Sequence, residues 1–208
     1  MNWFLRNWEQ VALALGEHLV IAGSALAIAF ALSLAAGIAA ARNQRVFAAA
    51  MAVSGILYTI PTLAFLALLI PVVGLGKANA IICMVAFSLL ILIRNIATGI
   101  REVPAEMTDA ARGMGMNATE ILWRIELPLA LPVIVAGLWI AAVTVISVTV
   151  VAAYVNAGGL GTIIFSGIAS DHPSKIVTGA LAACLLAVAV DLLLAALERR
   201  LKSRRAVA

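Results

Sequence analysis

The sequence predicts an all-α integral membrane protein with five transmembrane helices. Hydrophobic residues make up 64% of its 208 residues, and charged residues only 12%, about half the charged share of a typical soluble domain. Most of the chain consists of uncharged apolar runs, and about twenty such residues suffice to cross a bilayer. The one long polar passage is internal, at residues 101–128. Together these observations exclude an ordinary water-soluble domain.

The apolar runs define the expected elements in chain order. Residues 1–17 contain Trp3, Phe4 and Trp8 beside polar residues, which is typical of an amphipathic segment at the outer membrane interface. The transmembrane domain, residues 18–197, is expected to have its spans at about 18–41, 46–70, 78–100, 129–153 and 175–197. Pro61 lies inside the second span, where it removes a helical hydrogen bond that neighbouring groups must replace.

A sixth span is not expected between the fourth and the fifth. No charged residue occurs between Glu126 and Asp171, but the sequence NAGGLG at residues 156–161 breaks this run. The apolar run after the break, residues 162–170, is too short to cross a bilayer. Residues 154–174 are therefore expected to form an extracytoplasmic segment with a short interfacial or re-entrant helix.

The basic residues predict the orientation. With the C-terminus inside, eleven of the 14 Lys and Arg residues fall on the cytoplasmic side, and only Arg6, Lys77 and Lys175 fall outside. The N-terminus is then outside, whereas the loop at 101–128 and the basic tail at 198–208 are cytoplasmic. The net charge of +4 comes from residues that flank apolar spans, so the expected contact is membrane lipid rather than nucleic acid.

The polar loop has the pattern of helix, turn and helix. Pro104 suits the first position of a helix, and a glycine pair that ends with Gly115 is expected to stop it. Asn117 and Glu120 form a variant of the capping box, so a second short helix is expected to begin there. Pro128 is expected to end that helix before the chain re-enters the membrane.

The same loop resembles the EAA loop of bacterial ABC importer permeases. That loop has the form E-A-A, three residues, G, nine residues, I, one residue, L-P, and here Asp109 replaces the usual Glu. The matching residues are Asp109, Ala110, Ala111, Gly115, Ile125, Leu127 and Pro128. In such permeases the loop forms a coupling helix that docks into a groove on the cytosolic ATPase, so the resemblance implies that these residues couple the chain to that subunit.

Further segments resemble the permeases for quaternary-ammonium osmoprotectants, namely glycine betaine, carnitine, choline and proline betaine. They lie at residues 57–71, 93–100, 110–116 and 156–161. The methionine-type amino-acid importer permease is similar in size and span count and is the alternative. A more remote alternative is an ATP-independent channel or membrane scaffold. Either importer family implies a multi-pass protein of the bacterial cell (inner) membrane.

The resemblance implies a translocation subunit without catalytic activity. A second permease copy or a paralogue, two ATPase subunits that bind ATP and Mg²⁺, and an extracytoplasmic solute-binding protein would complete the importer. This chain itself has no G-x-x-x-x-G-K-[ST] phosphate loop, and no cofactor is expected on it. Its only histidines are His18 and His172 at expected outer edges, and Cys83 and Cys184 lie in apolar runs, so neither an embedded enzyme nor a metal site is expected.

Polar groups inside the spans are candidates for the translocation pathway, because they are costly in lipid. At the break around Pro61, freed carbonyls and an aromatic ring face could meet a passing cation. The candidates are Tyr58, Thr59, Pro61, Thr62, Asn95 and Tyr154. For each of them, helix packing or interfacial anchoring is the alternative interpretation.

Two charged residues lie inside spans. Arg94 and Asp191 are each about two turns from the expected cytoplasmic ends of the third and fifth spans. We hypothesise that they pair or share a water-filled inner vestibule, because an isolated charge is costly in the membrane. The alternative is that each side chain reaches the interface separately.

Overall fold

The computed structural model describes residues 2–205, with side chains for residues 3–199, and every regular element among them is helical. In chain order the elements are α1 (Asn2–Arg6), α2 (Trp8–Arg42), α3 (Gln44–Thr59), α4 (Thr62–Val73), α5 (Lys77–Arg101), α6 (Ala105–Gly113), α7 (Ala118–Ile121), the π-helix η1 (Leu122–Glu126), α8 (Leu127–Thr149), the 3₁₀-helix η2 (Val151–Val155), α9 (Leu160–Ala169) and α10 (Pro173–Arg205).

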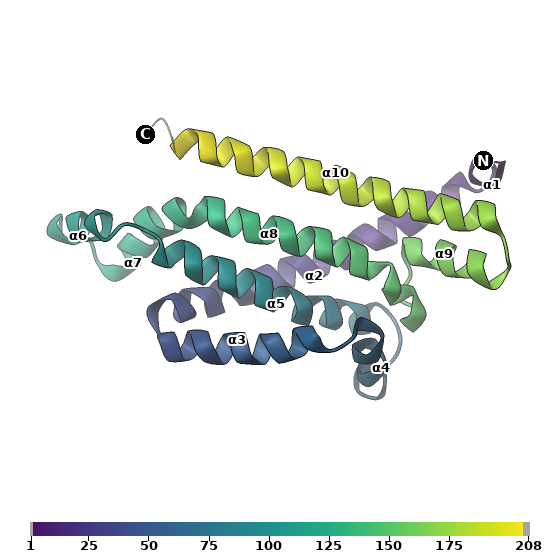
Figure 1. The fold of residues 1–208 in the computed structure, drawn as a ribbon, viewed down its shortest axis with the longest axis horizontal. Helices are drawn as coiled ribbons and strands as arrows, with labels where there is room; N and C mark the ends of the chain where they lie inside the picture. Colours follow the sequence, from purple (N-terminus) through teal and green to yellow (C-terminus); the bar gives the residue numbers. More distant parts are fainter. Residues whose placement is uncertain (1, 206–208) are drawn as a thin grey trace.

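Helix α5 is the centre of the bundle. It packs against α2, α8 and α3, and its side chains Met84, Leu92 and Ile96 are fully buried. In Figure 1, α8 lies between α5 and the long outer helix α10. Many apolar side chains of α10, such as Leu185 and Leu192, are exposed. A continuous apolar surface of this kind is unfavourable in water, which agrees with a helix that faces lipid or another membrane helix.

Four of the five expected spans are confirmed as single long helices, namely α2, α5, α8 and α10. A fifth is present if α3 and α4 together count as one. The boundary expected at His18 is not a break, because residues 8–17 are already part of α2. The charge of Glu17 does not interrupt that helix, since its carboxylate lies 3.4 Å from Lys77 Nζ and accepts a hydrogen bond of 3.1 Å from the Gly159 N–H.

The second span, expected at residues 46–70 with Pro61 inside it, is broken at that proline into α3 and α4. Helices α3 and α4 meet at an angle of 99°. Pro61 has no N–H to continue the ladder of α3, and the residue before a proline avoids helical backbone; Ile60 is accordingly extended, at φ −69° and ψ 126°. Sixteen residues of α3 span about 24 Å, so α3 alone falls short of a bilayer of about 30 Å.

The segment after α8 contains the short helix that the sequence predicts. After η2 the backbone turns at Asn156, which has a left-handed φ of 58° that asparagine tolerates better than most residues. Helix α9 comes next and packs against α10. The expected basic tail begins as part of α10, because this helix continues to residue 205. The side chains from residue 200 onward lie outside the described residues.

The polar loop lies at one end of the bundle. In Figure 1, α6 and α7 project from the end where α10 finishes, whereas α1 and α9 lie at the opposite end. The loop and the end of α10 therefore share a side, as the distribution of basic residues predicts. That this side is cytoplasmic stays a prediction.

Candidate functional site

The first half of the polar loop is an ordered helix with a glycine stop. The N–H of Met116 donates to the Ala111 carbonyl at 3.1 Å, and the N–H of Gly115 donates to the Arg112 carbonyl at 2.9 Å. This pair of bonds is the Schellman arrangement, which needs a left-handed residue at its turn. Gly115 supplies it with a φ of +84°, so the predicted stop is confirmed.

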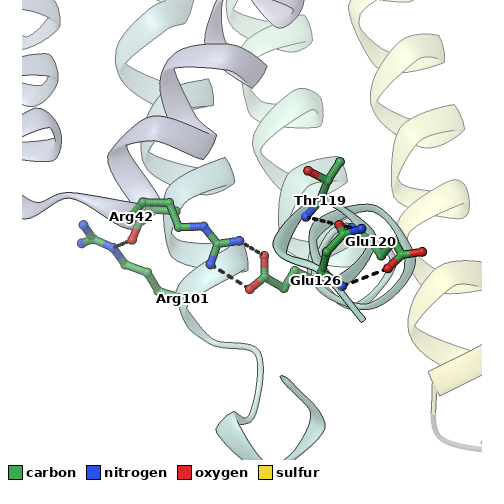
Figure 2. A network of polar contacts seen from close by, with 7 residues as sticks. Arg42, Arg101, Thr119, Glu120 and Glu126 are labelled. Carbon is green, nitrogen blue, oxygen red and sulfur yellow. Dashed lines mark hydrogen bonds and ion pairs between the residues drawn. The ribbon is translucent and has the colours of Figure 1, made fainter. Parts of the chain in front are cut away.

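The second half of the loop begins as predicted and ends differently. Asn117 and Glu120 form the reciprocal capping box at the start of α7, and Figure 2 shows Glu120 within it. Pro128 does not end the helix, because η1 leads directly into α8 and the helical path continues from residue 118 to 149. Pro128 comes just after η1, where the N–H of Leu127 bonds to the Leu122 carbonyl five residues back. The missing N–H of Pro128 therefore falls where the regular i→i−4 ladder is already interrupted.

The seven residues of the loop pattern do not form one cluster. Asp109 and Ala110 are exposed on α6, whereas Ala111 is buried. The Asp109 carboxylate lies 2.6 Å from Arg112 within the same helix. At the other end of the pattern, Leu127 packs against the hydrophobic core and is not part of the exposed surface of α6. The exposed surface of α6 therefore carries two acids, Glu106 and Asp109, beside Ala110 and Arg112.

Both ends of the loop are tied to the last turn of α2. Glu126 is buried and forms a two-bond ion pair with Arg42, with one of its bonds at 2.9 Å. Figure 2 shows this pair, with Arg101 beside it. Arg101 donates from Nε to the Ala41 carbonyl at 3.2 Å and from Nη2 to the Ala40 carbonyl at 2.6 Å. Sequence reasoning missed these anchors. A buried acid beside an apolar span signals that a partner exists, but the sequence does not identify it.

A groove of about 290 Å³ lies at the break between α3 and α4. It brings together four of the six pathway candidates, with further lining from α5 and α8. The lining residues are Tyr58, Thr59, Ile60, Pro61, Thr62, Phe87, Thr144 and Val148. The rings of Tyr58 and Phe87 meet edge to face, with their centroids 6.0 Å apart.

The lining of this groove is aromatic and hydroxylated, and it includes no charged side chain. Such a surface attracts an organic cation through ring faces and hydroxyl oxygens while binding it weakly. Sequence reasoning missed Phe87 and Thr144. The hydroxyl of Thr144 inside a span was a usable signal, but the apolar spans contain other phenylalanines and threonines that face elsewhere.

The remaining two pathway candidates lie outside the groove and fit the packing alternative. Asn95 donates to the Ile91 carbonyl at 2.8 Å and packs closely against Gly137 of α8. Tyr154 stacks on Phe165 with a centroid distance of 4.3 Å. The structure therefore does not bring these two residues together with the groove.

The hypothesised pairing of Arg94 with Asp191 is not formed. Asp191 accepts a hydrogen bond of 2.8 Å from Trp139 Nε1, and no ion pair joins Arg94 to Asp191 among the side chains of residues 3–199. Arg94 is exposed. The physical reason is that α8, which carries Trp139, lies between α5 and α10 (Figure 1). An indole N–H inside a span also requires an acceptor, and Asp191 supplies it.

Comparison with known proteins identifies relatives along almost the whole chain. Residues 20–203 match the family described as binding-protein-dependent transport system inner membrane component. The chain is 35% identical to the carnitine transport permease protein OpuCB of Listeria monocytogenes, over 97% of this chain and 92% of that protein. It is 33% identical to the glycine betaine/carnitine/choline transport system permease protein OpuCB of Bacillus subtilis, over 96% and 92%.

The fold has also been seen in a solved structure. Inward-facing MetNI, a methionine ABC transporter, contains a chain that superposes with a TM-score of 0.84 at 20% identity, covering 94% of this chain and 98% of that one. At this identity the likeness concerns the fold alone. It agrees with an all-helical bundle in which a polar loop connects two long helices.

Proposed function

The chain belongs to the family of binding-protein-dependent transport system inner membrane components, and from this premise we propose that it imports a quaternary-ammonium osmoprotectant. It is a membrane permease subunit without catalytic activity, and ATP is hydrolysed by a separate subunit. Glycine betaine, carnitine, choline and proline betaine are the proposed substrates. A methionine-type amino acid remains the alternative.

One observation carries the substrate class. The relatives named for carnitine and for glycine betaine, carnitine and choline match almost the full length of this chain at one third identity or slightly more. The methionine transporter matches only at 20% identity. The substrate proposal therefore follows the sequence relatives.

The groove at the α3–α4 break suits this class of solute. A trimethylammonium group has no N–H and therefore cannot donate a hydrogen bond. The face of an aromatic ring attracts such a cation by roughly 0.5–1 kcal/mol at an accessible site. Tyr58, which is 45% exposed, provides such a ring, and the buried Phe87 packs against it edge to face. An uncharged lining lets a zwitterion or a monovalent cation pass without being trapped. We therefore place the transit site in this groove, with most of the selectivity left to the solute-binding protein.

The exposed face of α6 is the proposed contact with the ATPase. Asp109 and Ala110 lie on it, and the Schellman turn at Gly115 fixes its direction. The complete importer would contain a second permease copy or a paralogue, two ATPase subunits that hold ATP and Mg²⁺, and an extracytoplasmic solute-binding protein. In this arrangement the loop faces the cytoplasm and the N-terminus faces outward.

Uptake of radiolabelled glycine betaine tests the proposal. Cells that lack their own osmolyte importers would express this chain with the ATPase and the binding protein encoded beside it. We expect uptake that requires all three components. Methionine uptake by the same assembly would replace the substrate proposal by its alternative, and solute flux without the ATPase would indicate a channel.

The tyrosine of the groove provides a more specific prediction. Tyr58→Ala is expected to lower glycine betaine uptake about fivefold, which corresponds to roughly 1 kcal/mol of lost ring contact. Tyr58→Phe keeps the ring and is expected to retain uptake. Tyr154→Ala is the matched control, because Tyr154 is also exposed but lies outside the groove. An equal loss in both alanine variants, measured at equal protein levels, would contradict a role of the groove.

A further inference from the structure

We propose that Arg42 and Glu126 are positioning residues that transmit movement of the polar loop to α3 and thereby to the groove. The proposal rests on the proposed function, in which this loop docks on the ATPase. The loop is covalently continuous with α5 and α8, which line one part of the groove, whereas α3 lines another part and is not joined to the loop directly. The proposal therefore adds a route from the loop to α3.

The first step of the argument is that one short segment holds both ends of the loop. Arg101, where the loop begins, donates to the carbonyls of Ala40 and Ala41. Carbonyls at the end of a helix lack partners within it, so this contact fixes the start of the loop to the end of α2. Glu126, where the loop ends, pairs with Arg42 in the same turn (Figure 2).

The second step is that the contact at Glu126 is stiff. A guanidinium that makes two parallel bonds to a carboxylate fixes orientation as well as distance. Glu126 is only 4% exposed, and breaking the pair would leave its charge buried without compensation. The end of the loop therefore cannot move away from α2 at little cost, and the two move together.

The third step connects the end of α2 to α3. Asn43 alone separates the two helices, and its Oδ1 accepts a hydrogen bond of 2.8 Å from the N–H of Arg45. The joint is therefore ordered. The Arg101 guanidinium also lies 4.5 Å from the ring centroid of Phe47 in the first turns of α3. A displacement of the loop is thus transmitted to the beginning of α3 through two contacts, the joint at Asn43 and the contact of Arg101 with Phe47.

The fourth step is the reach of α3. Within its bounds this helix contains no proline, and it runs from Gln44 to Thr59. Its last residues, Tyr58 and Thr59, line the groove. Because a hydrogen-bonded helix of this length moves largely as a unit, a shift at its first turn changes the groove at its last turn.

The test measures coupling in the complete importer, with permease, ATPase and solute-binding protein reconstituted in vesicles. Glu126→Gln keeps the size of the side chain but removes its charge. We expect the ratio of glycine betaine transported to ATP hydrolysed to fall about tenfold, as substitutions along a coupling route do, while basal ATP hydrolysis persists. Arg42→Gln is expected to give the same loss. The double variant is expected to lose no more than either single variant, because both act on one contact.

Arg45→Gln is the matched control. Arg45 is also exposed near the same joint, and it has no ion pair within the described part of the chain, so its loss should leave the ratio unchanged. Where Glu126→Gln does not accumulate in the membrane, Arg42→Lys retains the charge without the two-bond geometry and allows the same comparison.

Two results would overturn the inference. One is an unchanged ratio, with transport and ATP hydrolysis falling together. The other is a loss in the double variant equal to the product of the single losses. A failure of the proposed function is distinguishable from either, because it would appear in the unaltered assembly. If that assembly transports methionine, the ratio is measured with methionine, and ATP hydrolysis stimulated by the binding protein remains a readout independent of the solute.

Discussion

Gly161→Ala is expected to prevent stable accumulation of the permease. A Cβ built at Gly161 in α9 would overlap the carbonyl oxygen of Val150 and lie 2.9 Å from its carbonyl carbon and 3.0 Å from Ala153 Cβ. The obstructing atoms belong mainly to the backbone, so no side-chain rotation relieves the overlap. Overpacking of this kind costs about 3 kcal/mol. Membrane abundance and thermal unfolding in detergent would measure the loss.

A second glycine in a helix provides the control for this substitution. Gly16 lies in α2, and a Cβ built there would meet nothing within 4 Å. Gly16→Ala is therefore expected to be neutral or to stabilise α2 by up to about 1 kcal/mol. Equal abundance of the two variants would show that α9 does not pack as closely against the end of α8 as the structure indicates.

Gly115→Val is expected to abolish most of the uptake while the permease still accumulates. Gly115 has a φ of +84° and open space around its Cα, so the substitution creates no internal clash. A β-branched residue is strongly disfavoured in left-handed backbone, at a cost of roughly 1–3 kcal/mol. That strain is relieved most easily by opening the Schellman turn, which changes the direction of α6. The measurement is glycine betaine uptake normalised to permease abundance, with an expected loss of more than about tenfold.

Substituting the same position by asparagine separates backbone strain from bulk. Asparagine tolerates left-handed backbone, and Gly115→Asn is expected to keep most of the uptake. If valine and asparagine abolished uptake equally, the requirement would be for a bare surface at the docking site rather than for the turn. If neither changed it, the direction of α6 would have no part in coupling.

Local patterns in the sequence predicted the local structure because their partners lie a few residues apart. The capping box joins Asn117 and Glu120, and the glycine stop is decided within the turn at Gly115. The break at Pro61 results from the missing N–H of that residue. The prediction failed at Pro128, because the π-helical turn η1 before it lets the helical path continue through the proline. The sequence alone does not indicate that such a turn forms there.

The sequence by itself determined the class of the protein, four long apolar helices, the ordered polar loop and the residues around the break in the second span. Only the tertiary structure decided the partners of the charged groups. Arg42 meets Glu126 across 84 positions of the chain, and Asp191 meets Trp139 across 52. The tertiary structure also decided the angle of 99° between α3 and α4. It placed Tyr58, Phe87 and Thr144 in the lining of one groove. The physical reason is that apolar runs specify helices, whereas the neighbours of a side chain depend on how those helices pack, and packing is determined by all the surfaces at once.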